Sequence, residues 1–155
     1  MRMLSLLVAL TAAPAFAQPL ESIVPPGLEW QVSEYGFSPA TRAGDFIFVS
    51  GVVAGYATGE DGKPAEPTDA AIEAGFERAF GRLEEIIKAA GADWSDVVEM
   101  TTYHTDLPRQ GRILMAVKAR RFSAPYPAWT AIDVDRLWPD NGFAEIRLTL
   151  YAPNR

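Results

Sequence analysis

Short stretches with an alternating or a continuous hydrophobic pattern predict the strands of this chain. In residues 28–33 (LEWQVS) apolar and polar side chains alternate, which is typical of a half-buried strand. Residues 46–53 (FIFVSGVV) form a continuous apolar run rich in β-branched and aromatic side chains, which indicates an interior strand. Three more strands are expected over residues 97–105, 129–134 and 145–151, and a turn with the sequence PDNG joins the last two.

Apolar residues that recur at spacings of three and four predict two helices. Thr68 caps the longer one, which continues to about Ala90 and is stopped by Gly91. The shorter helix covers residues 110–122. Two segments rich in proline or glycine are expected to be irregular, a lead-in over residues 18–27 and a loop over residues 56–67.

The resulting order, β-β-α-β-α-β-β, predicts a small α/β domain whose two helices cannot cover both faces of the sheet. We therefore expect both helices on one face. Residues 145–151 fit this arrangement, because their apolar side chains fall on one face of the strand and their polar side chains on the other. A sheet with one bare face usually finds cover by oligomerising.

Residues 1–17 carry the three features of a cleaved secretory signal. Arg2 supplies a positive charge, residues 4–13 form an apolar run, and the sequence AFA at 15–17 offers small residues at both positions that a signal peptidase reads. The run is too short to cross a bilayer as a helix, which takes about 20 residues. The alternative is a buried N-terminal helix. We expect secretion, into a bacterial periplasm, and a single domain over residues 18–155.

The composition of the 155-residue chain excludes several function classes. Its formal net charge of −6 argues against sequence-independent nucleic-acid binding, which depends on clustered Lys and Arg. The absence of cysteine excludes disulfides, thiol nucleophiles and thiolate metal sites. The single histidine, His104, excludes an all-histidine metal site within one chain, and a core or interface role suits it better than a catalytic one.

Four other residues have side chains that can take part in catalysis or ligand binding: Ser50, Asp133, Asp135 and Glu145. Ser50 lacks the flanking pattern of a nucleophile elbow, so a serine triad is not expected. Asp133 and Asp135 share one face of a strand, where solvation or pairing with Arg136 accounts for them. Glu145 opens the last strand. Partial burial there would raise its pKa toward the range of a general base, although a solvated glutamate fits the sequence equally well.

Three stretches, in order, cover nearly all of the chain after the signal. They are FSPATRAGDFIFVSG at residues 37–51, FGRLEEIIKAAGA and YHTDL within residues 80–107, and YPAWTAIDV followed by EI within residues 126–146. Together they resemble the RidA (YjgF) family of reactive intermediate deaminases. The resemblance implies a chorismate-mutase-like α/β fold with a mixed sheet and two helices on one face. It also implies a homotrimer with a central barrel of sheets and a small-molecule cleft at each subunit boundary.

The resemblance further implies a set of site residues. Family members with known activity hydrolyse 2-imino or enamine acids to 2-oxo acids and ammonia, and they use no metal or organic cofactor. Glu145 matches the family glutamate thought to order the attacking water, which makes it the expected catalytic residue. The substrate-binding positions implied in the same way are Phe37, Ser50, Gly51, Trp129 and Ala131.

The chain departs from the family pattern at three positions. Trp129 stands where the family has an arginine that grips the substrate carboxylate with two parallel hydrogen bonds. Phe37 replaces a tyrosine and Val52 replaces a glutamine. Because each change removes a polar group, the cleft is expected to prefer a small uncharged or aromatic ligand. Otherwise Arg42 or Arg147 would have to supply a guanidinium from elsewhere in the fold.

Two functions are therefore expected from the sequence. The first is an imine or enamine deaminase of altered specificity, without cofactor or metal, in which Glu145 positions water. The second is a non-catalytic periplasmic module that binds a small ligand. A ribonuclease is disfavoured by the acidic chain and the lack of a histidine pair, so neither nucleic acid nor, after signal cleavage, a membrane is an expected partner.

Overall fold

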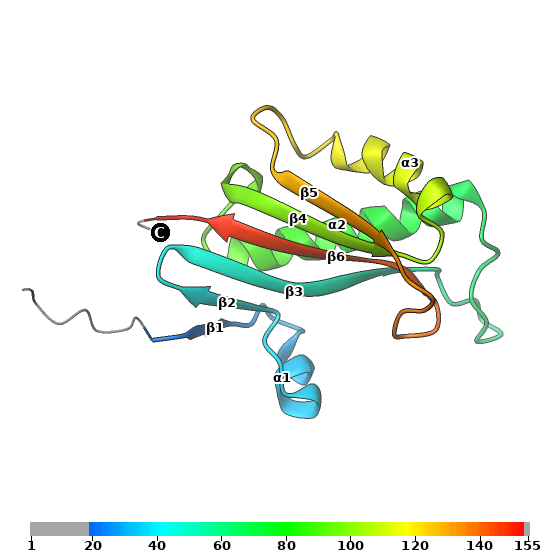
Figure 1. Ribbon diagram of the computed structural model, residues 1–155. Helices are drawn as coiled ribbons and strands as arrows, with labels where there is room; N and C mark the ends of the chain where they lie inside the picture. Colours follow the sequence, from blue (N-terminus) through cyan, green and yellow to red (C-terminus); the bar gives the residue numbers. More distant parts are fainter. Residues whose placement is uncertain (1–18, 154–155) are drawn as a thin grey trace, which may run out of the picture.

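The computed structural model describes residues 19–153, so the predicted signal sequence at residues 1–17 lies outside the described residues. The chain forms one six-stranded mixed sheet (Figure 1). Neighbouring strands are antiparallel, except that β4 and β5 run parallel. In spatial order the strands are β1 (Glu21–Ile23), β2 (Ala40–Ala43), β3 (Phe46–Gly55), β6 (Gly142–Tyr151), β4 (Val97–His104) and β5 (Ala128–Asp133).

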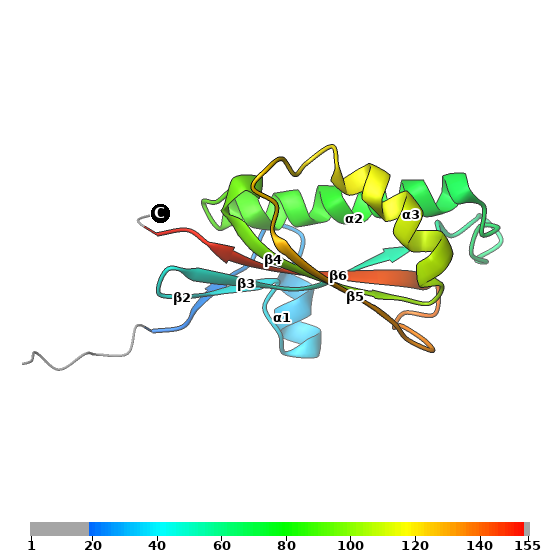
Figure 2. The same ribbon diagram turned by 45° about the horizontal axis from the view of Figure 1, so that its top comes forward.

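Two of the helices form a layer on one face of this sheet. They are α2 (Asp69–Ala89) and α3 (Leu107–Lys118), and both lie on the same side (Figure 2). The third helix, α1 (Glu29–Tyr35), lies beyond the β1–β2 edge, and a 3-10 turn, η1 (Trp94–Asp96), precedes β4 (Figure 1). The predicted one-sided coverage of the sheet is therefore confirmed.

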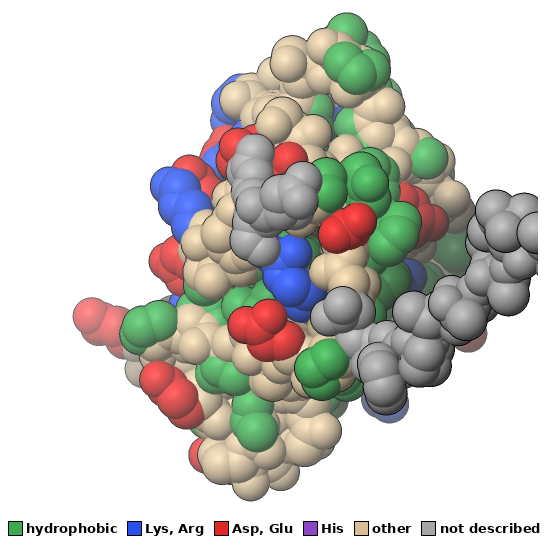
Figure 3. Space-filling view, turned by 90° about the vertical axis from the view of Figure 1, so that its left-hand side faces the viewer, with side chains coloured by type: hydrophobic (Ala, Val, Ile, Leu, Met, Phe, Trp, Pro, Cys, Tyr) green, Lys and Arg blue, Asp and Glu red, His purple; other side chains and the backbone are tan. Residues whose placement is uncertain are grey.

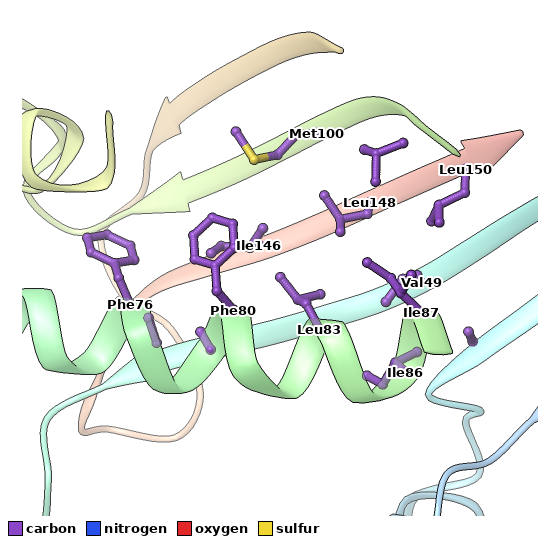
Figure 4. Packing of buried hydrophobic residues seen from close by; sticks show 14 of the residues in the cluster. Val49, Phe76, Phe80, Leu83, Ile86, Ile87, Met100, Ile146, Leu148 and Leu150 are labelled. Atoms are coloured by element: carbon purple, nitrogen blue, oxygen red, sulfur yellow. The ribbon is translucent and has the colours of Figure 1, made fainter. Parts of the chain in front are cut away.

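Helix α2 supplies most of the helical side of the core, as its periodicity predicted. The Thr68 hydroxyl oxygen accepts a hydrogen bond from the Ala71 N–H at 3.1 Å, and Gly91 follows the helix with a φ of 69°. The apolar side chains of α2 point at the strands, as Figure 4 shows. The two packed layers consist of Phe76, Phe80, Leu83, Ile86 and Ile87 on the helix, and of Val49, Met100, Ile146, Leu148 and Leu150 on the sheet.

The strand predicted over residues 28–33 is wrong, because this segment lies mostly in helix α1. The free edge of β2 is already paired with β1, and β1 lies within the lead-in that was expected to be irregular. The segment instead satisfies its backbone groups locally, within the helix. Gly36, with a φ of 71°, then ends the helix and donates its N–H to the Val32 carbonyl at 3.2 Å.

The last two strands do not form a hairpin, because β4 lies between β5 and β6. Their connection, including the PDNG turn, crosses to the β3 side, where the Asn141 amide donates to the Tyr56 carbonyl at 2.9 Å. Helix α3 also begins earlier than predicted. Its start is fixed by Asp106, whose side chain accepts from the Arg109 N–H, and by Pro108 in the first turn.

The surface carries both signs of charge. At the end of the sheet where the chain terminates, basic and acidic side chains are interspersed with apolar ones (Figure 3). No helix within residues 19–153 has the length and apolar character needed to cross a bilayer.

Candidate functional site

A cavity lies at the edge of the sheet where β3 is only half covered. Strand β2 pairs with β3 only as far as Val49, and α1 lies beside the remainder of this edge (Figure 1). The cavity there has a volume of about 570 Å³. Its lining includes side chains or backbone of Leu28, Trp30, Phe37, Ser50, Gly51, Val52, Arg82, Ile86, Trp138 and Glu145.

The carboxylate of Glu145 is one of the polar groups that line this cavity. Glu145 lies on β6 opposite Val53, and its Oε1 packs against the backbone of Gly51, where an added methyl group would lie only 1.6 Å away. Among residues 19–153, none donates a hydrogen bond to this carboxylate. Burial raises the pKa of the Glu145 carboxyl above its ordinary value. The group therefore holds a proton more strongly than a solvated glutamate, which suits it to general-base chemistry.

Ser50 and Gly51 are brought to Glu145 by an irregularity in β3. The register between β3 and β6 shifts between Val49 and Val52, so these two residues form a bulge in the strand. The Ser50 hydroxyl donates to the Ser38 carbonyl at 2.7 Å, which occupies its hydrogen. Ser50 thus shapes the cavity, and its hydroxyl is not paired with a histidine.

The other walls of the cavity are mostly apolar. Phe37 lines it with an exposed ring that lacks the hydroxyl of a tyrosine. Arg82 of α2 is the basic residue of the lining, and its guanidinium lies 2.7 Å from the Glu85 carboxylate in an exposed ion pair. Arg42 donates instead to two backbone carbonyls, and the exposed Arg147 lies outside the lining.

Trp129 and Ala131 lie on the other face of the sheet from Glu145. The Trp129 indole N–H donates to the Thr102 hydroxyl at 3.0 Å, and the Lys118 ammonium lies 4.5 Å from the indole centroid. Thr102 is fully buried under α3, and Ala131 pairs with it in the β4–β5 register. Within one chain, the cavity therefore unites Phe37, Ser50, Gly51 and Glu145 without the two β5 residues.

His104 is a core residue, as predicted, and it makes two hydrogen bonds. Its Nδ1 lies 3.2 Å from the Gln110 amide oxygen and its Nε2 lies 2.9 Å from the Thr102 hydroxyl. The Gln110 oxygen can only accept, so Nδ1 carries the hydrogen and Nε2 accepts from Thr102. Burial lowers the pKa of His104 and keeps the ring neutral. Thr102 thus bonds to both His104 and the Trp129 indole N–H, and this network holds the Trp129 side chain against the core of its own subunit.

Asp133 is exposed to solvent, as predicted, and it also accepts a hydrogen bond that the sequence did not indicate. Its Oδ1 accepts the Leu107 N–H at 2.7 Å, at the start of α3, and Asp135 lies beyond the end of β5. The positive end of a helix stabilises a carboxylate there. Over residues 19–153, no three His, Cys, Asp or Glu side chains are grouped to hold a metal ion.

Three residues at the cavity could not be predicted from the sequence: Trp30, Arg82 and Trp138. The alternation around Trp30 indicates a strand where the structure has a helix, and Trp138 precedes a turn that connects two strands which are not neighbours in the sheet. The spacing of Arg82 on the polar side of α2 gave no sign of a site. These residues come together because of the positions at which α1 and the β5–β6 connection pack. No local sequence pattern indicates those positions.

Comparison with known proteins identifies the family of this chain. Residues 31–151 match the family described as Endoribonuclease L-PSP. The chain belongs to the RidA (YjgF/L-PSP) family. The RutC family protein YjgH of Escherichia coli K12 is 39% identical over 114 residues, which cover 73% of this chain and 82% of YjgH. The chloroplastic Reactive Intermediate Deaminase A of Arabidopsis thaliana is 34% identical over 110 residues, or 71% of this chain and 55% of that protein.

Solved structures of the RidA family share the fold. Protein YJGH superposes with a TM-score of 0.69 at 34% identity, and the match covers 87% of this chain and 98% of that one. RidA from the Antarctic bacterium Psychrobacter sp. PAMC 21119 gives a TM-score of 0.60 at 30% identity, with coverage of 86% and 98%. The expected family and its α/β sheet are thereby confirmed.

Proposed function

We propose that this RidA-family chain hydrolyses small, uncharged imines or enamines to oxo compounds and ammonia. The observation that carries the proposal is the Glu145 carboxylate, which is partly buried, has a raised pKa and receives no hydrogen bond from residues 19–153. Such a carboxylate is available to bind and deprotonate a water molecule. The kinship to a protein named Reactive Intermediate Deaminase A supports the same class of reaction.

The reaction needs only one water and one proton carrier. As the water oxygen bonds to the imine carbon, Glu145 takes one water proton and passes it to the imine nitrogen, which gives a neutral carbinolamine. Glu145 then takes the proton of the carbinolamine hydroxyl and delivers it to the amino nitrogen as the C–N bond breaks, so that the hydroxyl becomes the carbonyl and ammonia leaves. The sum is R₂C=NH plus H₂O giving R₂C=O plus NH₃, and Glu145 ends in its starting state.

The lining of the cavity favours an uncharged substrate. A carboxylate on the substrate would lie near the Glu145 carboxylate, and like charges in a half-buried site repel. Arg82 is already paired with Glu85, while Phe37 and Val52 offer no polar group. The indole N–H of Trp129 is committed to Thr102. A neutral imine avoids the repulsion and needs no guanidinium.

We also propose a homotrimer, supported by the apolar side chains on the helix-free face of the sheet. The Phe46 ring contacts those of Phe48 and Tyr151 there, and all three side chains remain exposed in the single chain. An exposed patch of this kind marks an interface. In a trimer, Trp129 and Ala131 of one subunit can border the cavity of the next. Light scattering at micromolar concentration is expected to give the mass of three chains. A stable monomer mass would overturn the assembly.

The substrate class is tested with two imines. Benzaldimine is generated from benzylamine by a flavin amine oxidase, and 2-iminopropionate from alanine by an amino-acid oxidase. The protein is expected to accelerate ammonia release from benzaldimine by a factor of about 10² or more over buffer, the effect of a positioned general base. Hydrolysis of 2-iminopropionate should stay near the buffer rate. If neither imine is hydrolysed faster, the ligand-binding alternative replaces the hydrolase.

A further inference from the structure

Three aromatic residues form a cluster at the outer wall of the cavity. Trp30 and Tyr35 come from α1, and Trp138 comes from the connection between β5 and β6. The Tyr35 ring meets Trp30 edge-on, with centroids 5.6 Å apart, and meets Trp138 at 5.3 Å. We call these three residues the aromatic cluster.

The fold does not account for the aromatic cluster. Helix α1 has no buried residue, and the side chains of Trp30, Tyr35 and Trp138 are 42%, 50% and 65% exposed. Large aromatic side chains are usually well buried, and a contiguous exposed group of them marks a binding surface. Trp30 and Trp138 also line the cavity, so their rings border the space that contains Glu145.

The size of the cavity indicates a small ligand. A volume of about 570 Å³ falls within the range of about 300–1,000 Å³ that is typical of small-molecule sites. The lining contributed by α1 and by the β5–β6 connection is apolar except for Gln31, and the polar groups Ser50 and Glu145 stand on the strands. A ligand that fits this division has an aromatic group at one end and a small neutral polar group at the other.

We propose that Trp30 and Trp138, with Tyr35 in contact with both, form a subsite for the aromatic group of the cavity's ligand. This inference deepens the proposed function, on which it rests for the placement of the reacting group at Glu145. Trp30 and Trp138 are thus the residues that determine specificity, and the preferred substrates are neutral imines or enamines with an aromatic substituent. Ring-to-ring contacts favour a planar π-system over a saturated ring of the same size.

The subsite is tested by binding of two unreactive amides of matched size, measured by titration calorimetry. Benzamide has an aromatic ring, whereas cyclohexanecarboxamide has a saturated one. The wild-type protein is expected to bind benzamide about fivefold to tenfold more tightly, the advantage of one or two aromatic contacts. In Trp30→Ala and in Trp138→Ala this preference should fall toward one. Tyr126→Ala serves as the matched control, because Tyr126 is 68% exposed and lies outside the cavity lining.

Two results would overturn the aromatic subsite: equal binding of the two amides by wild type, or a preference that survives both tryptophan substitutions. Circular dichroism should show intact folding in each variant, since Trp30, Tyr126 and Trp138 are all exposed. The outcome is separable from that of the proposed function. If benzamide is preferred but benzaldimine is not hydrolysed, the subsite stands and the hydrolase fails. If benzaldimine is hydrolysed without any aromatic preference, the reverse holds.

Discussion

Glu145→Gln is expected to lower kcat/KM for benzaldimine by a factor of about 10²–10⁴, the usual contribution of a general base. Glutamine has the shape of glutamate but cannot take a proton from water. Binding of benzamide should persist, because the apolar walls are unchanged. An unaltered rate in this variant would show that the carboxylate is not the base. Loss of turnover with retained binding distinguishes the hydrolase from a module that only binds.

A second substitution reaches the same carboxylate by steric means. The methyl group of Gly51→Ala would overlap Glu145 Oε1, so the carboxylate must leave its position. The rate should fall nearly as far as in Glu145→Gln. Gly81→Ala is the matched control, because no heavy atom lies within 4 Å of its added methyl. Equal rates in both alanine variants would contradict the assigned position of the carboxylate.

The pH profile gives an independent signature of Glu145. The base must be ionised, so the rate rises as the pH passes upward through the pKa of Glu145. Burial raises that pKa, and the acid limb of kcat/KM should therefore lie above the ordinary glutamate value of 4.5. Glu145→Gln should abolish this limb, whereas Gly81→Ala should leave it in place.

Wild-type protein is expected to hydrolyse 2-iminopropionate at nearly the buffer rate, and Trp129→Arg with Phe37→Tyr should raise this rate. A hydrogen bond to a charged group contributes about 1.5–3 kcal/mol, which corresponds to roughly 10- to 150-fold in carboxylate binding. Trp129→Arg alone should recover less, because Phe37 still lacks its hydroxyl. The rescue requires β5 of one subunit to border the cavity of a neighbouring subunit. The reason is that the side chain of residue 129 faces away from the cavity of its own subunit.

Each outcome of the 2-iminopropionate experiment has a structural meaning. A wild-type rate equal to that of an arginine-bearing RidA protein would show that another residue holds the carboxylate. Arg82, the basic side chain of the lining, would then be the residue to replace. Rescue in the double variant, together with a trimer mass, would establish that the cavity is completed at a subunit boundary.

The sequence predicted the elements whose signals are local. Helix α2 lies where its apolar spacing and its Thr68 cap placed it, and β3 lies where the long apolar run indicated. Helix α1 was mistaken for a strand because the alternation in residues 28–33 does not reveal that β1 already occupies the sheet edge.

The site was predicted in part for a related reason. Ser50, Gly51 and Glu145 meet because β3 and β6 pair, and the family resemblance carries that pairing. The direction of the Trp129 side chain depends on the β4–β5 register, in which it pairs with buried Met100, and a motif does not contain this information. The aromatic cluster joins distant parts of the chain and had no local signal.

Helix α1 contributes side chains to the cavity but none to the buried core. Its seven residues contribute no buried side chain, while the cavity they border is closed on its inner side by a core of α2 against the sheet. Substitutions in α1 are therefore expected to alter which ligand the cavity accepts at little cost in free energy of unfolding. This makes α1 the segment to vary when the ligand preference of the cavity is redesigned, with the α2–sheet scaffold and Glu145 left unchanged.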